Sequence, residues 1–153
     1  MEQTLVILKP SAVIRELCGE VISRIERKGL TITGMKMLQL TDEILEEHYA
    51  HLVSRPFFPS LKRSMMATPV VVLCVEGLDA VAVVRKMTGA TNSRNAEPGT
   101  IRGDFSMSGQ QNIVHASDSV ENAKIELARF FKESEIFSYK PATLDYLYAD
   151  DEI

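Results

Sequence analysis

The sequence Val70-Val71-Val72-Leu73-Cys74-Val75 is the most apolar run in the chain, and Gly77 soon ends it. Apolar residues in one short run, followed by a turn residue, are typical of a buried strand. The similar run Leu5-Val6-Ile7-Leu8 stops before a Lys-Pro pair and predicts another buried strand. Two further strands are predicted at residues 32–40 and 112–115, so we expect a sheet of four strands.

Helical patterns fill most of the segments between these strands. Apolar residues recur at a spacing of three or four, and cap or stop residues mark several helix ends. At the last helix, Asp118 with Glu121 three residues later resembles a capping box. The predicted helices are one that carries Leu17, Val21 and Ile25 and stops at Gly29, one that starts at Thr41-Asp42 and extends to Leu52, a short one at 60–66, one at 78–88 closed by Gly89, and one that carries Val120, Leu127, Phe130 and Phe131.

The segment from Ala90 to Gln111 is different, because Gly, Asn, Ser, Pro and Asp dominate it and no period survives. A loop of this length inside a compact domain is usually functional. The order of elements contains two strand-helix-strand units in one domain, residues 1–153. It favours an α+β fold, a ferredoxin-like antiparallel four-stranded sheet covered by helices over one face. A doubly wound parallel sheet is the competitor, but it would usually have more strands.

Composition excludes several classes of protein. The 153 residues are 45% hydrophobic and 25% charged, which is ordinary for a globular protein. A net charge of −4 argues against nucleic-acid binding, which needs a basic surface. No apolar run is long enough to span a membrane, and we expect no signal peptide. Only Cys18 and Cys74 are present, so there is no disulfide framework and a cytoplasmic location is expected.

His115 is the first candidate for covalent chemistry. It lies between a short apolar run and a helix-start signal, where a side chain can be exposed at its tip and held from behind. A core histidine bonded to a backbone carbonyl explains the same pattern about equally well. His48 and His51 could form a metal pair on one helix face, but no third ligand lies nearby, and two helix histidines without a metal are the preferred interpretation.

Basic residues at the ends of elements could meet at one place: Lys9 after the first strand, Arg85 late in a helix and Arg102 in the long loop. In the segment 98–104, glycines would let backbone N–H groups approach an anion, and Arg102 offers a planar fork for phosphate oxygens. Neither the phosphate-binding loop GxxxxGK[ST] nor the dinucleotide fingerprint GxGxxG is present.

Four motifs together resemble those of the nucleoside diphosphate kinase family, over nearly the whole length of the chain. They are Lys9-Pro10, Arg55-Pro56-Phe57-Phe58, the segment 98–105 (PGTIRGDF) and the segment 112–118 (NIVHASD), in order and at the right separations. The resemblance implies the ferredoxin-like fold and transfer of the γ-phosphate of a nucleoside triphosphate, typically ATP, to a nucleoside diphosphate. It also implies a ping-pong mechanism through a phosphohistidine.

The resemblance also implies a role for individual residues. His115 matches the nucleophile, Glu126 the acid that orients its ring, and Tyr49 a tyrosine packed nearby. Lys9, Arg85, Thr91, Arg102 and Asn112 match the contacts to phosphate and sugar. Lys9 also counts among the catalytic residues. Phe57 matches the aromatic that stacks on the base, with Leu61 beside it, and stacking tolerates every base and sugar. Mg²⁺ is implied as cofactor, held mainly through the nucleotide phosphates with no metal ligands from the protein.

Three places depart from the family pattern: Ser11-Ala12 where Asp-Gly is frequent, Gln110-Gln111 where Gly-Arg is common, and Ala116 where Gly is commoner. They leave the local backbone conformation and the turnover rate open. A nucleotide-binding regulatory module and an RNA-binding ferredoxin-like domain are the alternatives. The first needs no nucleophile, and the second lacks its aromatic sheet motif. The resemblance further implies a homo-oligomer, a hexamer or a tetramer, with the long loop and the aromatic tail as interface elements.

Overall fold

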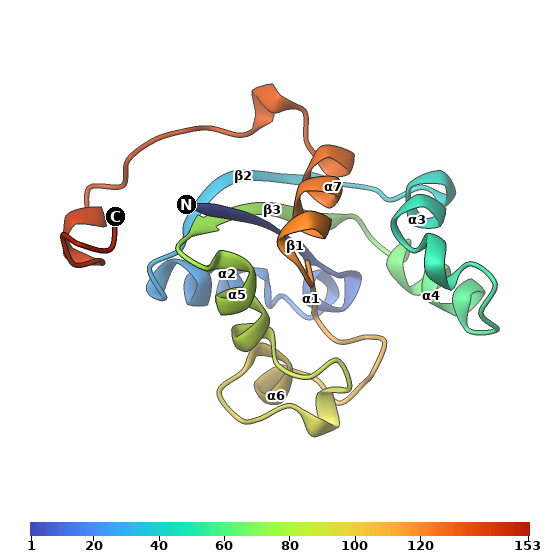
Figure 1. The fold of residues 1–153 in the computed structure, drawn as a ribbon. Helices are drawn as coiled ribbons and strands as arrows, with labels where there is room; N and C mark the ends of the chain where they lie inside the picture. The colour runs from blue at the N-terminus through green and yellow to red at the C-terminus, as the bar shows by residue number, and fades with distance from the viewer.

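The computed structural model describes all residues from 1 to 153 and contains one antiparallel sheet in the order β2-β3-β1-β4 (Figure 1). The strands are β1 (Glu2–Leu8), β2 (Thr31–Leu38), β3 (Val70–Gly77) and β4 (Val114–Ala116). All three strand pairs are antiparallel. The predicted ferredoxin-like sheet is therefore confirmed, and the parallel competitor is excluded.

Helices cover both faces of the sheet, so the prediction that they lie over one face was wrong (Figure 1). The two central strands are the reason. β1 is buried at every position from Thr4 to Leu8, and β3 at nearly every position, so both faces need cover. Val6 and Leu8 join one core cluster, whereas Leu5 and Ile7 join another on the opposite face.

The first core cluster includes residues of α1 (Pro10–Ile14), α2 (Cys18–Arg27), α5 (Ala80–Thr88) and α6 (Ile101–Phe105). The second includes residues of α3 (Asp42–His48), α4 (Phe58–Met65) and α7 (Val120–Phe130). Short 3-10 turns lie at Ala50–Leu52, Ser93–Asn95, Glu133–Glu135 and Leu144–Tyr146. Most predicted helices are therefore present, but the sequence did not predict α1 or α6, and α3 ends four residues earlier than expected.

The cap of α7 is a further correction. Ser119, not Asp118, is the N-cap, and its hydroxyl accepts a hydrogen bond from the Asn122 backbone N–H at 3.1 Å. Asp118 instead accepts from the side-chain amide of Asn122 at 2.6 Å. The predicted box with Glu121 is absent because the helix begins one residue later, which moves the third helical position to Asn122.

Two extensions leave the sheet. The segment after α5 forms a separate lobe that carries α6 (Figure 1). The C-terminal tail runs beside β2, where the Phe137 N–H and the Tyr139 hydroxyl donate to the carbonyls of Thr33 and Ile32, at 2.8 and 2.9 Å. None of the helices combines the length and the hydropathy needed to cross a membrane.

Candidate active site

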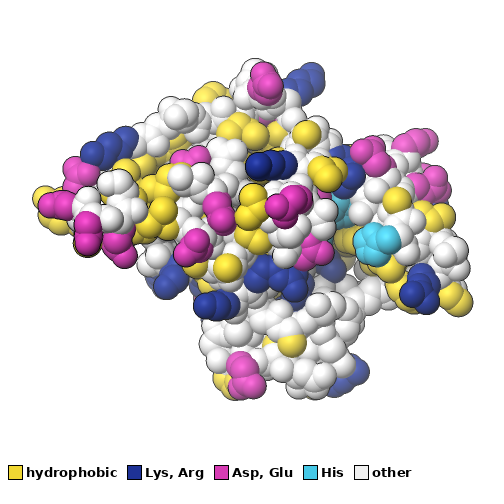
Figure 2. Space-filling view, viewed as in Figure 1, with side chains coloured by type: hydrophobic (Ala, Val, Ile, Leu, Met, Phe, Trp, Pro, Cys, Tyr) yellow, Lys and Arg dark blue, Asp and Glu magenta, His cyan; other side chains and the backbone are white.

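The main cleft of the molecule, with a volume of about 850 Å³, lies at the junction of α3, α4 and α7 with the α6 lobe, and residues of all four line it. Lys and Arg side chains gather at this junction, with a histidine to one side (Figure 2). The structure brings all the sequence-predicted site residues to this cleft. They are Lys9, Tyr49, Phe57, Leu61, Arg85, Thr91, Arg102, Asn112, His115 and Glu126.

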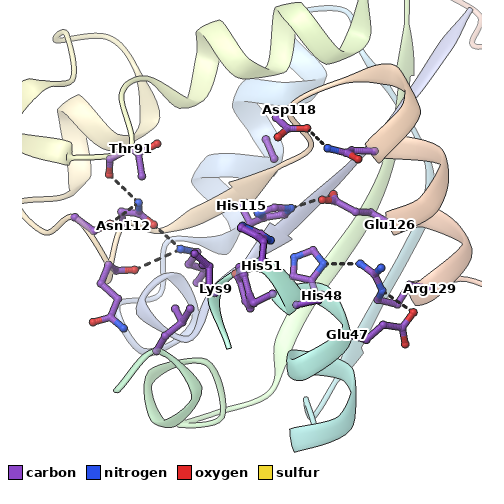
Figure 3. A pocket seen from close by; sticks show the side chains of 18 of the residues that line it. Lys9, Glu47, His48, His51, Thr91, Asn112, His115, Asp118, Glu126 and Arg129 are labelled. Atoms are coloured by element: carbon purple, nitrogen blue, oxygen red, sulfur yellow. Dashed lines mark hydrogen bonds and ion pairs between the residues drawn. The ribbon is translucent and has the colours of Figure 1, made fainter. Parts of the chain in front are cut away.

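His115 lies in β4 opposite Ile7 of β1, and Nε2 of its ring is 3.0 Å from the Glu126 carboxylate (Figure 3). Burial by itself would raise the pKa of Glu126, but hydrogen bonds from His115 and Ser117 lower it below its usual value. An ionised carboxylate only accepts hydrogen bonds, so Nε2 of His115 carries the proton and Nδ1 keeps its lone pair. Ser117, fully buried, donates to the same carboxylate oxygen at 2.7 Å.

The backbone just before His115 is strained. Ile113 is fully buried and has a φ of 73°, which is rare for a β-branched residue. The Val114 N–H donates to the Asn112 carbonyl at 2.8 Å across it, which closes a γ-turn. The Ile113 N–H donates to the Ser11 hydroxyl at 3.1 Å, and its carbonyl accepts from the Lys9 N–H at 2.8 Å. The departure from the family pattern at Ser11 therefore supplies an acceptor that this turn uses.

Lys9 and Asn112 form one polar unit at the cleft wall (Figure 3). Lys9 Nζ donates to Asn112 Oδ1 at 2.6 Å, and the Asn112 amide donates to the carbonyls of Thr91 and Gly109 at 2.8 and 3.1 Å. Burial, and next the charge of Arg102, lower the pKa of Lys9 to about 7. Asn112 thus has no amide hydrogen free for a ligand, and Oδ1 keeps only its second lone pair.

Arg102 is almost entirely buried and donates to three backbone carbonyls, those of Gly89, Asn112 and Val114, at 2.8, 3.3 and 2.8 Å. A guanidinium has five N–H donors, so two remain for an anion in the cleft. Burial and the nearby charge of Arg85 lower the pKa of Arg102 to about 10, so it is a cation at neutral pH. Arg85 itself makes no ion pair with the protein.

Aromatic residues close the other end of the cleft. Phe57 precedes α4 and is 50% exposed, whereas its neighbour Phe58 is buried in the core. Leu61 lies one turn further along α4 and lines the cleft beside Phe57. Tyr49 is buried with its ring centroid 6.4 Å from that of His115, and burial raises its pKa above the usual value. The exposed face of Phe57 is the only one of these surfaces free to stack on a flat ligand.

The structure separates His48 from His51. α3 ends at His48, and His51 lies exposed on the turn that follows, so they do not share a face as a metal pair requires. His48 instead packs on His115, and a ring nitrogen of each lies within 4.8 Å of the other and of a Glu126 oxygen. Mg²⁺ prefers oxygen ligands, so two imidazoles and one carboxylate do not suit it.

The sequence did not predict that His48, Ser117 and Arg129 belong to this site. Spacing signals existed for all three. His48 follows the buried Leu45 by three residues on α3, and Arg129 follows Glu126 by three residues on α7, so each pair shares a helix face. Ser117 comes two residues after His115, which places both side chains on the same side of a strand.

Comparison with known proteins agrees with this geometry. The family model described as nucleoside diphosphate kinase matches residues 2–136. The chain is 62% identical to nucleoside diphosphate kinase of Parabacteroides distasonis, over 99% of each chain. It is 46% identical to nucleoside diphosphate kinase B of Bos taurus, over 96% of this chain and 97% of the relative.

Solved structures give the same result. A halophilic nucleoside diphosphate kinase from Halobacterium salinarum, solved in complex with CDP, superposes with a TM-score of 0.94 at 36% identity. The alignment covers 97% of this chain and 99% of that one. Since a family model, close relatives and solved structures all match over nearly the full length, the chain belongs to the nucleoside diphosphate kinase family, whose members use a divalent cation to transfer phosphate between nucleoside triphosphates and diphosphates.

Proposed function

We propose that this enzyme carries the γ-phosphoryl group on Nδ1 of His115. The observation that supports this most directly is the bond between His115 Nε2 and Glu126, because it leaves the Nδ1 lone pair free at the cleft. The lone pair attacks the γ-phosphorus of a triphosphate, the bond from phosphorus to the β–γ bridging oxygen breaks, and the diphosphate leaves with that electron pair. A terminal oxygen of a second diphosphate then attacks the phosphorus, and the phosphorus–nitrogen bond breaks.

The cations of the cleft would stabilise the charge that develops on the transferred group. This charge is spread over three equatorial oxygens, so positioning and electrostatics carry most of the catalysis. Arg85 has its whole guanidinium available, Arg102 has two N–H donors left, and Lys9 gains charge when an anion approaches. We propose Mg²⁺ as the divalent cation, bound mainly through the nucleotide phosphates, where it would neutralise further negative charge.

Phe57 is proposed to stack on the base, with Leu61 beside it and Thr91 at the sugar–phosphate end. Its half-exposed ring offers a π face that any base can use. The related Halobacterium enzyme was solved with CDP, a pyrimidine nucleotide. A site that relies on stacking accepts both purine and pyrimidine nucleotides, with ribose or deoxyribose.

We also propose that the chain is one domain, 1–153, that it works in the cytoplasm, and that it assembles as a hexamer or tetramer. The two cysteines are unpaired, which fits a reducing compartment. The outer strand β2 leaves Met35 and Met37 exposed at 58% and 61%, beside a part of the strand edge to which the C-terminal tail donates no hydrogen bond. Proteins usually cover such an edge, and a second copy of the chain would do so. Light scattering will give the number of copies.

The experiment that tests the mechanism is phosphoenzyme trapping. The enzyme is incubated with triphosphate labelled at the γ position, and acid-labile label is expected on His115. Addition of an unlabelled diphosphate should chase the label into triphosphate. Absence of label from the protein, or full activity of His115→Ala, would contradict the proposed role of His115.

A further inference from the structure

His48 is an ionisable side chain that lies next to the proposed nucleophile, and the proposed mechanism gives it no role. It is 8% exposed, and its ring packs edge-on against His115 with the two centroids 4.6 Å apart and the planes at 77°. Tyr49 and Phe130 pack on the same ring at 4.6 and 5.2 Å. In Figure 3, His48 lies next to His115 on the side away from Asp118. The ring has little room to turn in this enclosure.

Arg129 determines which nitrogen of His48 carries the proton. Its Nη1 lies 3.0 Å from His48 Nδ1, and its Nε is held 3.0 Å from the Glu47 carboxylate. A guanidinium can only donate, so Nδ1 must be the acceptor and the proton must be on Nε2. His48 is therefore a neutral ring with a defined tautomer. Burial, and then the charges of His115 and Arg129, lower the pKa of His48 to about 3, which is consistent with a neutral ring.

The Nε2–H of His48 is buried and has no hydrogen-bond partner in the protein. Unpaired buried donors are rare because they cost free energy, and each one in a native protein calls for an explanation. A ring nitrogen of His48 lies within 4.8 Å of a ring nitrogen of His115 and of a carboxylate oxygen of Glu126. Nε2 carries its proton in either charge state, but a charged His48 would attract this carboxylate more strongly and compete with His115 for it, whereas a neutral one leaves it to His115.

We propose that His48 is a positioning residue for phosphoryl transfer: held by Arg129, its uncharged ring keeps the His115 imidazole in the orientation that bonds Glu126 and leaves Nδ1 for the substrate. The inference rests on the proposed function of His115. It predicts that loss of the His48 ring lets the nucleophile turn, and that misplacement of a reacting group by about 1 Å lowers the rate by about 10²-fold.

Two measurements on four variants test the proposal. The first is the single-turnover rate of phosphoenzyme formation at saturating triphosphate, and the second is the tautomer of His115, read by ¹⁵N NMR of histidine-labelled enzyme. His48→Ala removes the ring. His48→Gln keeps an oxygen for Arg129 and an uncharged N–H donor, and Arg129→Met removes the donor to His48. Leu45→Ala, a buried residue of the same helix, controls for lost packing.

In wild-type enzyme we expect one His115 tautomer, protonated on Nε2. His48→Ala should show mixed tautomers and a phosphorylation rate lower by about 10- to 100-fold, with the KM for nucleotide within about two-fold of wild type. Gln should restore most of the rate. Arg129→Met should shift the tautomer of His48 with a smaller loss of rate. This variant tests the positioning role if His48→Ala does not fold. Leu45→Ala should lower the melting temperature and leave the His115 tautomer unchanged.

A wild-type rate together with a single His115 tautomer in His48→Ala would overturn the proposal, as would mixed His115 tautomers in Leu45→Ala. A failure of the underlying function looks different. In that case wild-type enzyme itself takes up no label on His115, while the tautomer measurement still reports whether His48 orients the ring.

Discussion

Replacement of Arg102 by lysine should destabilise the protein even though it keeps the charge. The guanidinium bonds three backbone carbonyls at once, from Gly89, Asn112 and Val114. A lysine ammonium is a single point on a flexible stem and can reach one of them. The Asn112 carbonyl still accepts from the Val114 N–H, so a lysine that reaches one of the other two carbonyls leaves one of them unpaired in a mostly buried place, at about 1–3 kcal/mol. With the lost bond to Asn112, at about 0.5–1.5 kcal/mol, the expected loss is about 2–4 kcal/mol, a large part of the ~5–15 kcal/mol that holds a typical domain together.

Thermal unfolding followed by circular dichroism measures this loss. For a chain of this length each kcal/mol corresponds to about 2–4 °C, so Arg102→Lys should melt about 10 °C below wild type. Protein concentration must be equal in all samples, because assembly would also shift the melting temperature. Arg94→Lys is the matched control, since Arg94 makes one exposed bond to a backbone carbonyl, that of Met107, at 2.9 Å.

The control should stay within about 2 °C of wild type, because exposed substitutions usually cost less than ~0.5 kcal/mol. If Arg102→Lys melts as close to wild type as the control does, the three carbonyl bonds do not hold the α6 lobe against the strand. The lobe would then have to be held by its apolar contacts, such as that of the buried Ile101.

Three further outcomes follow from the cleft. Phe57→Ala should raise the KM for all nucleotides by about ten-fold in steady-state kinetics, since stacking is worth about 1–3 kcal/mol per base. Phe58→Ala should instead lower the free energy of unfolding by about 3–5 kcal/mol, as measured by denaturant unfolding. Glu126→Gln should lower kcat by about 10²-fold with KM nearly constant, and a rise in KM as large as the fall in kcat would contradict an orienting role. Because burial and then the Arg102 charge lower the pKa of Lys9 to about 7, Lys9 is mostly uncharged at about pH 8, and a bound phosphate should raise that pKa. Calorimetry in buffers of different ionisation heat should then show proton uptake on diphosphate binding, reduced in Lys9→Met.

The strands could be predicted from sequence because each is an apolar run between turn residues. Cover on both faces was also encoded, since an unbroken run such as Val70–Val75 has apolar side chains on both sides of the sheet. The two missed helices are short and are defined by their first residues. Pro10 stands at the first helical position of α1, where a proline is tolerated but also ends the preceding strand. In α6, Gly103 and Asp104 hide the helical period, although Thr100 caps it.

For the site, too, some features could be predicted from the sequence and others could not. Most of the cleft residues could be identified through the family resemblance, either inside its four motifs or by matching positions between them, and the pairing of His115 with Glu126 was predicted in the same way. The partners of Arg102 could not be predicted, because backbone carbonyls have no side-chain signature and come together only in the folded chain. For the same reason the sequence suggested Arg102 as a phosphate ligand but not as the residue that joins the lobe to the sheet.

The strained turn at Ile113 links the segment that carries Lys9 to the segment that carries His115. A positive φ at a β-branched residue costs about 1–3 kcal/mol and survives only where its surroundings hold it. Here Ser11 accepts from its N–H, and the Lys9 N–H donates to its carbonyl. The segment that carries Lys9 is therefore bonded, on both sides of Ile113, to the segment that carries His115. Since Lys9 Nζ is also held by the Asn112 side chain, the folded chain sets the distance between this amine, which we propose binds phosphate, and the proposed nucleophile His115 before any nucleotide enters.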